Sequence, residues 1–340
     1  MTLNAKSYHL IRSGERYDVV RSNHIVPEPD HHQVIIRLAA ASLNYRDLLN
    51  QQDITSNRAG LIPLSDGAGI VAGVGSKVSR WKEGDRVSIN FFPDWKGGRF
   101  SLDYLARALG GGQTDGVLSE YIVADESSLV EVASHLTLRE AACLPCAGVT
   151  AWHALFERGM LNAGDTVLVQ GTGGVALFGL QLAKAHGARV IVISSSDAKL
   201  AQARSLGAWQ TINYQTQPDW HKVALDLTDG KGVDYILELG GPDTYDRSVA
   251  AIAAGGHIAQ IGVLTGFALQ PKILPLMFKN ANIHGICVGS VEHFQRLNQF
   301  LSDHQLHPVI NQVFDFDSVP EAYERLRSAV HAGKIVIDLA

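Results

Sequence analysis

Hydrophobic residues in the middle of the chain gather in short runs separated by stretches of helical spacing. Four of the short runs are predicted to be buried strands, namely residues 166–169, 189–194, 233–239 and 257–263. After the first run, Val175, Phe178 and Leu182 recur at helical spacing and therefore share one face. Gly187 follows at a position expected for a C-cap glycine. The pattern predicts a strand–turn–helix–strand unit over 166–194.

The flanking parts of the chain follow a different pattern. Residues up to about 123 are predicted to be rich in β-structure, with a strand at 33–38 and a glycine-spaced, tightly bent strand pair at 67–78. Residues 40–49 run on into a short helix or turn, and residues 91–116 are predicted to form a long loop. The C-terminal part contains strands at 283–288, 309–314 and 335–339, and helices at 291–301 and 319–329.

A glycine-rich turn joins the first predicted strand to its helix. Gly171, Gly173 and Ala176 occupy the three small positions of a G-x-G-x-x-G/A pattern that also contains Gly174 and Val175. The first glycine permits a tight turn, the second lets the backbone approach a pyrophosphate, and the alanine lets helix and strand pack closely. The amides and dipole at the helix N-terminus favour a diphosphate. Because the turn lies between two strands and opens a helix, it predicts dinucleotide binding.

Composition narrows the class of protein. A chain of 340 residues with 46% hydrophobic and 19% charged residues is typical of an ordinary α/β protein of about two domains. The net charge of −5 provides no electrostatic footprint for nucleic acid or for acidic membranes. The N-terminus lacks the apolar core of a signal peptide, and three cysteines suit a reducing compartment. We therefore expect a cytoplasmic protein that binds neither nucleic acid nor membrane.

Several segments, in their order along the chain, resemble the medium-chain dehydrogenase/reductase superfamily. They are residues 42–47, 66–69, 84–87, 147–152 and 333–337, together with the glycine turn. The resemblance implies an α/β fold in which a Rossmann domain, a doubly wound parallel sheet, is inserted into a GroES-like β-barrel catalytic domain. On this reading, residues 1–146 and 289–340 form the discontinuous catalytic domain, and residues 147–288 form the dinucleotide-binding domain.

The metal-binding positions of the superfamily are altered. Zinc-dependent members have a Cys on the segment matching 44–47, a His, often followed by Glu, where this chain has Ser65 and Asp66, and a Cys on the segment before Thr150, where this chain has Cys146. Of these, only Cys146 remains, and residues 91–116 contain none of the four cysteines of a structural zinc lobe. Catalytic zinc normally needs three protein ligands, so we predict no metal site. A zinc alcohol dehydrogenase with unusual ligands around Cys146 and Asp66 stays as the alternative.

The motif at 43–47 resembles the quinone oxidoreductase and enoyl reductase side of the superfamily. Members there reduce quinones, enones or 2-enoyl thioesters by hydride transfer from NADPH. The resemblance implies that Asn44, Tyr45 and Asp47 face the reacting carbon. A phenol can donate a hydrogen bond to a carbonyl oxygen as it becomes an enolate, so Tyr45 is the candidate acid, with a solvent proton as an equal possibility. Alternatively, Asn44 and Asp47 brace the local turn through side-chain to backbone bonds.

The residue at the end of the second predicted strand, 189–194, indicates whether the site prefers NAD or NADPH. Sites that prefer NAD usually carry Asp or Glu there, and alignment with the family puts Ser194 at this position. Together with Ser195 and Lys199, Ser194 is predicted to bind a 2′-phosphate, and NADPH is the expected cofactor. A small error of register would bring Asp197 to the ribose instead. Alternatively, residues 194–197, which include Ser196, only N-cap the next helix, and both interpretations can hold together.

The resemblance supplies the remaining cofactor residues. Thr150 would lie close to the nicotinamide ring, and Tyr214 near the adenosine phosphate. Backbone groups would bind the carboxamide, and these come from Val263, Val288, Gly289 and Ser290.

Partners follow from the same resemblance. We expect a small hydrophobic carbonyl or quinone substrate and a homodimer paired through the strand at 283–288, because an apolar edge strand needs covering. A cofactor-binding protein without turnover, acting as a redox sensor or structural protein, stays as an alternative of another class. Cys143 and Cys146 have C-x-x-C spacing but precede a helical stretch, which favours buried core thiols. Phe91, Phe92 and Trp95 either wall a pocket or belong to the core.

Overall fold

The computed structural model describes residues 3–268 and 272–339. The chain divides into two compact units, one formed by Met1–Val149 with Gly289–Ala340 and the other by Thr150–Val288. We call them the split unit and the inserted unit. No helix in the described part of the chain is long and apolar enough to cross a membrane.

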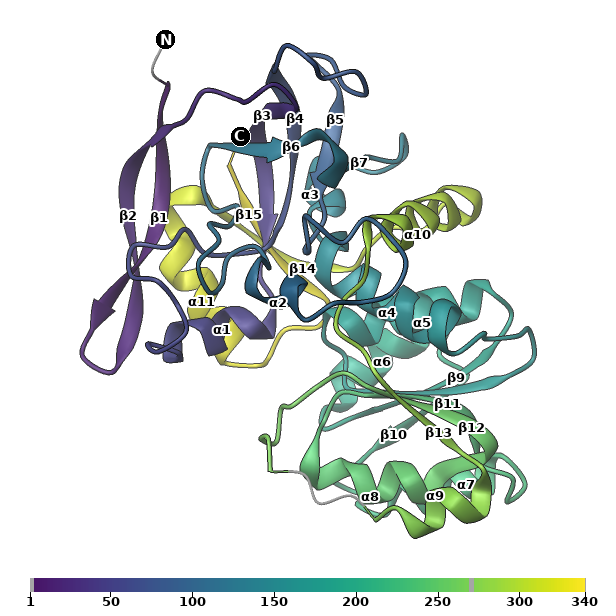
Figure 1. Ribbon diagram of the computed structural model, residues 1–340. Coiled ribbons are helices and arrows are strands. Elements are labelled where there is room, and N and C mark those ends of the chain that lie inside the picture. The colour runs from purple at the N-terminus through teal and green to yellow at the C-terminus, as the bar shows by residue number, and fades with distance from the viewer. Residues whose placement is uncertain (1–2, 269–271, 340) are drawn as a thin grey trace. The chain divides into compact units, whose positions relative to one another are not determined.

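The inserted unit is built on a sheet of six strands, shown with its flanking helices in Figure 1. In spatial order they are β10 (Gln210–Asn213), β9 (Arg189–Ser194), β8 (Thr166–Gln170), β11 (Val233–Glu238), β12 (Ile252–Gln260) and β13 (Asn282–Gly285). All neighbouring strands are parallel. The order of the strands reverses between β8 and β11, and in such sheets a ligand binds at the carboxyl ends of the strands at this point.

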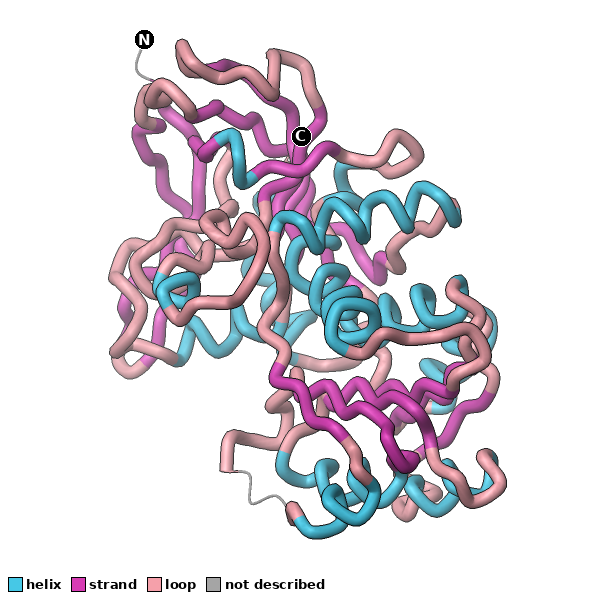
Figure 2. The backbone as a smooth tube through the Cα atoms, turned by 45° about the vertical axis from the view of Figure 1, so that its right-hand side comes forward, coloured by secondary structure: helices cyan, strands magenta, loops and turns pink. Residues whose placement is uncertain are grey.

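Helices cover both faces of this sheet. They are α5 (Gly174–Ala185), α6 (Asp197–Ser205), α7 (Trp220–Leu227), α8 (Pro242–Ala251) and α9 (Leu274–Lys279). In Figure 1, α7, α8 and α9 lie on one side of the sheet and α5 on the other, and Figure 2 shows the strands as a layer between helices. The strands are buried on both faces, which explains why they are apolar runs rather than alternating ones.

The split unit contains a second, mostly antiparallel sheet. Its strands follow the order β14 (Ile310–Asp315), β15 (Lys334–Asp338), β3 (Gln33–Ser42), β4 (Asp66–Val74), β5 (Arg86–Ile89) and β7 (Leu129–Glu131), and β6 (Tyr121–Asp125) also pairs with β3. A separate hairpin is formed by β1 (Leu3–Ser13) and β2 (Arg16–Val26). The fold is therefore the α/β architecture predicted from the sequence, with a GroES-like domain and a Rossmann-like parallel sheet.

Helices of the split unit pack around this sheet. They are α1 (Tyr45–Gln52), α2 (Asp103–Ala106), α3 (Leu138–Ala141), α10 (Val291–His304) and α11 (Val319–Arg327). Between α3 and the inserted unit, the backbone forms wider π-helical turns on both sides of α4 (Val149–Trp152). The tail strand β15 pairs with β3 and β14, so the two sequence segments of the split unit share one sheet.

Two details of the sequence prediction are corrected. Residues 67–78 do not form a strand pair, because β4 is one strand whose register to β3 shifts twice. Its glycines do allow close approach of another backbone, since a Cβ on Gly69 would lie 2.2 Å from the carbonyl oxygen of Arg37. The strand predicted at 283–288 ends at Gly285, and Val288 takes a left-handed conformation with φ of 48°. This conformation is rare for a β-branched residue and cannot continue a strand.

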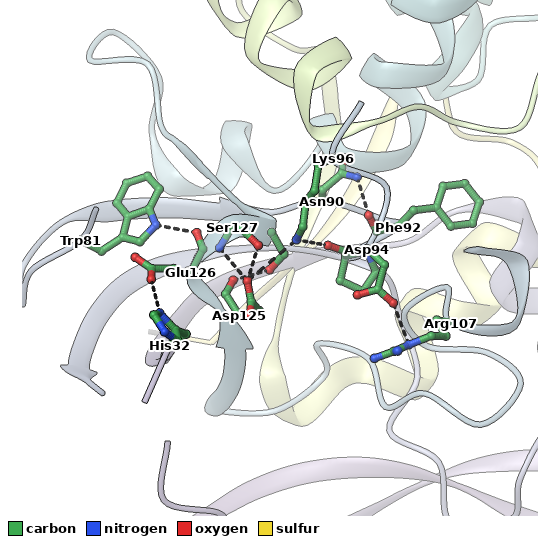
Figure 3. Close-up of polar contacts among 12 residues, drawn as sticks. His32, Trp81, Asn90, Phe92, Asp94, Lys96, Arg107, Asp125, Glu126 and Ser127 are labelled. Atoms are coloured by element: carbon green, nitrogen blue, oxygen red, sulfur yellow. Dashed lines mark hydrogen bonds and ion pairs between the residues drawn. The ribbon is translucent and has the colours of Figure 1, made fainter. Parts of the chain in front are cut away.

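Buried carboxylates fix loops in both units. Figure 3 shows Glu126 of the split unit beside His32 and Trp81. The Glu126 carboxylate lies 3.0 Å from His32 Nδ1, and this hydrogen bond lowers the pKa of the Glu126 carboxyl group. The backbone oxygen of Glu126 accepts a hydrogen bond from Trp81 Nε1.

In the inserted unit, fully buried Glu238 at the end of β11 accepts hydrogen bonds from the backbone amides of Gly240 and Gly241. This contact orders the glycine turn that follows β11.

Candidate functional site

The glycine turn of the inserted unit has the geometry of a phosphate cradle. Gly171 follows β8 with φ of 79°, and Gly173 is the N-cap of α5 with no side chain capping the helix. A Cβ built on either glycine meets no atom within 4 Å, so their outer side faces open space. Ala176 is buried against the sheet, and a Cβ on Gly179 would lie 2.3 Å from Leu237 Cδ1. The close packing of helix and strand thus requires small residues, as predicted.

The end of β9 places Ser194 next to β10. Ser194 is buried, pairs with Asn213 in the parallel ladder, and accepts a hydrogen bond of 3.1 Å from the backbone amide of Tyr214. Its neighbour Ser195 is exposed, and the side chain of Tyr214 is also exposed. Because the carboxyl ends of parallel strands meet at one edge, these residues and the glycine turn lie on the same edge of the sheet.

The start of α6 accounts for the other polar residues of this segment. Ser196 is the N-cap, and its side chain accepts from the amide of Lys199, as the capping alternative supposed. Asp197 lies in the first turn and accepts a hydrogen bond of 2.8 Å from the Asn213 side chain. That bond commits one carboxylate oxygen of Asp197 to β10.

The residues predicted to bind the carboxamide use several of their groups within the protein. The carbonyl of Val288 lies 2.7 Å from Nδ1 of His153, a ring whose pKa burial lowers. Ser290 caps α10 in a reciprocal capping box with His293, and it is fully buried. Gly289 accepts a hydrogen bond from the side chain of Asn90. These bonds fix the backbone from 288 to 290, and its role toward a cofactor stays a prediction.

Two further predicted cofactor residues belong to the inserted unit. Thr150 lies on α4 and is buried. Val263 follows β12 in a turn where its carbonyl accepts from the amide of Gly266, and its Cα lies 3.3 Å from where a Cβ on Gly241 would be. Gly241 has φ of 101°, so the loops after β11 and β12 approach each other only because glycine stands there.

The predicted catalytic motif of the split unit forms the start of α1. Asn44 is the N-cap, Tyr45 is the first helical residue with an exposed phenol, and Asp47 lies one turn on and is fully buried. One carboxylate oxygen of Asp47 accepts from the Asn44 amide at 2.7 Å, which is the local bracing considered for this residue. The other oxygen is buried and has no hydrogen-bond partner among the described residues. Burial raises the pKa of Asp47 to about 6, against the opposing effect of nearby Arg46.

A buried lysine, which the sequence analysis did not single out as a site residue, lies next to this motif. Lys334 begins β15, and its Nζ donates to the carbonyl of Leu43 at 2.6 Å and to Oδ1 of Asn44 at 2.5 Å. It also lies 3.8 Å from Oδ2 of Asp66, which is fully buried. The available signal was a lysine at the head of a strand whose next three residues are apolar, but the pairing of β15 with β3 is needed to show which groups the lysine contacts.

The cysteines near this cluster are not joined in a disulfide. Cys143 is buried and Cys146 is partly exposed. The prediction of two buried core thiols is therefore confirmed for Cys143 only. Burial raises the pKa of both thiols, that of Cys143 to about 12, so neither is a ready thiolate at neutral pH. The backbone amide of Cys146 donates to Oδ2 of Asp66 at 3.1 Å, and Ser65 donates to Oδ1 at 2.7 Å. Both oxygens of Asp66 are thus occupied by protein donors.

The aromatic residues of the long loop belong to its core. Phe91, Phe92 and Trp95 are buried, and Trp95 stacks on Tyr104 at 6.0 Å between ring centroids. Arg46 of α1 lies 4.6 Å above the Phe91 ring and donates to the carbonyl of Leu109. Arg46 is therefore paired, and it ties the loop to the helix that carries the predicted catalytic residues. Within residues 3–268 and 272–339, no three His, Cys, Asp or Glu side chains are grouped to hold a metal ion.

Family models match both units of the chain. Residues 30–134 match a model described as the alcohol dehydrogenase GroES-like domain, and residues 174–303 match one described as zinc-binding dehydrogenase. These matches agree with the architectures of the two units.

Curated relatives resemble almost the whole chain. A zinc-type alcohol dehydrogenase-like protein of Schizosaccharomyces pombe is 41% identical over 90% of this chain and 91% of its own length. A 2-methylene-furan-3-one reductase of Solanum lycopersicum is 31% identical over 94% of this chain and 74% of its length. A quinone oxidoreductase of Mus musculus is 27% identical over 94% and 92%. A crystal structure assigned as an alcohol dehydrogenase from Sinorhizobium meliloti 1021 superposes with a TM-score of 0.93, at 41% identity and complete coverage of both chains.

The buried carboxyl of Asp47 predicts a defined pH dependence of stability. Because its pKa in the folded protein is raised to about 6, the folded state keeps this proton to higher pH than the unfolded state. The wild-type free energy of unfolding therefore loses roughly 3 kcal/mol from this group as the pH rises from about 4 to about 6. Asp47→Asn cannot titrate, so its stability relative to wild type should increase across that window. Urea unfolding at about pH 4.5 and about pH 7.5 measures the difference.

Asp53→Asn is the control, since hydrogen bonds from Ser56 and Thr55 lower the pKa of that partly exposed carboxyl to about 2. The Asp53→Asn substitution should change the free energy of unfolding by the same amount at both pH values. Equal behaviour of the two variants would show that Asp47 is not a raised, buried acid.

Proposed function

The chain belongs to the medium-chain dehydrogenase/reductase superfamily, within its quinone oxidoreductase-like branch, and from this membership we propose an NADPH-dependent, zinc-independent oxidoreductase. It transfers a hydride to a quinone or to an activated alkene such as an enone or enoyl compound. The family consists of oxidoreductases that bind a nicotinamide dinucleotide. The choice of NADPH, the absence of zinc and the acceptor are the proposed parts.

The glycine turn supports dinucleotide binding by this chain. The outer sides of Gly171 and Gly173 are open, and α5 is twelve residues long and begins without a side-chain cap. Its first amides therefore need acceptors, which the phosphate oxygens of a dinucleotide provide. In this proposal Gly174, Val175 and Ala176 supply the amides at the start of the helix.

The choice of NADPH rests on the end of β9. A carboxylate at position 194 would bond the ribose hydroxyls and repel a 2′-phosphate, but a serine stands there. Ser195 and Lys199 add a hydroxyl and an ammonium, both suited to a dianionic phosphate. Asp197 is the nearest acid in sequence, and its bond to Asn213 directs one carboxylate oxygen to β10.

The observation that carries the proposal is the state of Asp66. Zinc-dependent relatives have a ligand His, often followed by Glu, where this chain has Ser65 and Asp66. Here both carboxylate oxygens of Asp66 accept from protein donors, one of them Ser65, and an ammonium lies 3.8 Å away. An ammonium at this distance repels a divalent cation, and the described residues offer no set of three ligands. The residues present do not fit a catalytic zinc.

Without a metal, acceptors that delocalise charge are favoured. Zinc assists alcohol oxidation by stabilising an alkoxide, whereas hydride addition to a quinone or enone produces a phenolate or enolate whose charge is already spread. Bound NADPH supplies the hydride. The exposed phenol of Tyr45 can donate a hydrogen bond to the oxygen of the acceptor, and buried Asp47 keeps the N-cap of α1 in place. Either Tyr45 or solvent then delivers the proton.

The first measurement is the affinity for NADPH and for NADH by fluorescence titration. We expect NADPH to bind tighter by about tenfold or more, equivalent to roughly 1.4 kcal/mol. Ser194→Asp should reverse this order, because the new carboxylate repels the 2′-phosphate and bonds the ribose. Asp197→Asn is the matched control and should leave the ratio unchanged. A change of preference in that control would mean that Asp197, not Ser194, lies at the ribose.

Turnover tests the reaction itself. We expect NADPH consumption with quinones and enones, little oxidation of simple alcohols with NADP, and rates unaffected by dialysis against a zinc chelator. Loss of activity on chelation would instead favour the zinc alcohol dehydrogenase. Tight NADPH binding without consumption across the panel would favour the non-catalytic sensor or structural protein.

We also propose a homodimer formed through the inserted unit. Strand β13 lies at the edge of the six-stranded sheet with Ile283 exposed, and apolar side chains of α9 are exposed beside it in sequence, namely Leu274, Met277 and Phe278. An apolar edge of this kind is protected when it pairs with a second copy. Sedimentation should show a species of twice the chain mass, and Ile283→Lys should convert it to monomer. A wild-type monomer at micromolar concentration would overturn the dimer.

A further inference from the structure

Lys334 places a positive charge inside the split unit. The residue is 3% exposed, and it comes from the far end of the chain to meet the segment before α1. Its ammonium donates to a carbonyl oxygen of Leu43 and to the side-chain oxygen of Asn44. A buried ammonium needs partners because its desolvation is costly. Asp66, fully buried at 3.8 Å, supplies the compensating charge.

The ammonium decides how the Asn44 amide is turned. An ammonium has three donors and no acceptor, so only the oxygen of an amide can face it. Oδ1 of Asn44 therefore points to Lys334 and Nδ2 points away. Nδ2 is buried and has no hydrogen-bond partner among the described residues. An unsatisfied buried donor is costly, and in a native site it indicates a partner supplied by water or ligand.

The backbone of Asn44 is fixed from the other side. Its amide donates to Asp47 at 2.7 Å, while the preceding carbonyl of Leu43 accepts from Lys334. Asn44 is thus restrained at its amide, at its side-chain oxygen and at the peptide before it. Nδ2 is the one polar group of its side chain left for a ligand.

We infer that Lys334 is a positioning residue, holding Asn44 so that Nδ2 donates to the acceptor's oxygen as hydride arrives. This inference rests on the proposed function and names the group that stabilises the developing oxyanion. The ammonium polarises the amide through its oxygen, which strengthens the N–H donor on the opposite side. A preorganised donor of this kind stabilises charge without reorganisation during the reaction.

The test compares variants of the full-length protein in NADPH oxidation by a quinone or enone that wild type reduces. Asn44→Asp keeps an acceptor for Lys334 but removes Nδ2, so kcat should fall by about 100-fold. Lys334→Met together with Asp66→Asn removes both buried charges, which avoids an unpaired carboxylate, and should lower kcat by at least about tenfold. The affinity for NADPH should not change in either case.

Coupling separates positioning from a general structural effect. If Lys334 acts through Asn44, combining all three substitutions should cost no more than Asn44→Asp alone. Lys334→Arg keeps a donor toward Asn44, so this variant should keep most of the wild-type kcat. Lys279→Met is the matched control, because Lys279 is another partly buried ammonium, bonded to the carbonyls at the end of α8, and it has no part in the proposed chemistry. It should lower stability and leave kcat unchanged.

The possible failures are distinguishable. If wild type consumes no NADPH with any quinone or enone, the proposed function fails and this role fails with it. If wild type turns over but Asn44→Asp or the charge-neutral pair keeps wild-type kcat, the inference alone is overturned. Multiplicative losses in the combined variant, or weakened NADPH binding with unchanged kcat, would equally overturn it. Stoichiometric zinc in the purified, active protein would show that a metal, not Lys334, supplies the charge.

Discussion

The split unit depends on one buried ammonium at the start of its last strand. Lys334 reaches Leu43 and Asn44 because β15 pairs antiparallel with β3, with Val336 opposite Ser42. The chain enters β15 through Gly333, at φ of 83°, where a Cβ would lie 2.2 Å from a backbone oxygen of Val309. Glycine at position 333 therefore permits the turn, and the turn places Lys334 at the start of β15. The buried ammonium of Lys334 requires a nearby negative charge, which Asp66 provides at 3.8 Å.

This dependence explains which parts of the molecule the sequence predicted. The phosphate turn is local: Gly171, Gly173 and Ala176 lie within one strand–helix connection, and their spacing alone specifies a backbone. The order of the sheet follows from repeated strand and helix signals, since crossovers of parallel strands have one hand. Lys334, Leu43 with Asn44, Asp66 and Cys146 come from four segments far apart in the chain, and no short pattern predicts that they meet. The lysine belonged to a segment that indicated the family, but the groups that it contacts are seen only once β15 pairs with β3.

Other differences have equally local causes. The strand predicted at 283–288 is shorter because Val288 turns into a left-handed conformation, and its carbonyl is bonded by buried His153. Hydrophobic residues continue past the strand end, so the apolar run overstates its length. Phe91 and Phe92 are likewise hydrophobic enough for either a pocket wall or a core. Only their packing with Trp95 and Arg46 decides between those two interpretations.

A zinc ion and a buried ammonium stabilise negative charge on a substrate oxygen to different extents, so proteins of one fold can favour different substrates. A zinc ion contacts the substrate oxygen directly and stabilises a localised alkoxide, whereas in the role we propose a lysine bonded to an asparagine acts through one intervening amide. The second arrangement delivers less charge to the oxygen, and it is sufficient only where the product anion spreads its own charge. Quinones and enones meet that condition and simple alcohols do not. A chain that matches a zinc-binding dehydrogenase model over residues 174–303 can therefore keep the fold and the cofactor turn, while, as we propose, its buried charges favour a different acceptor.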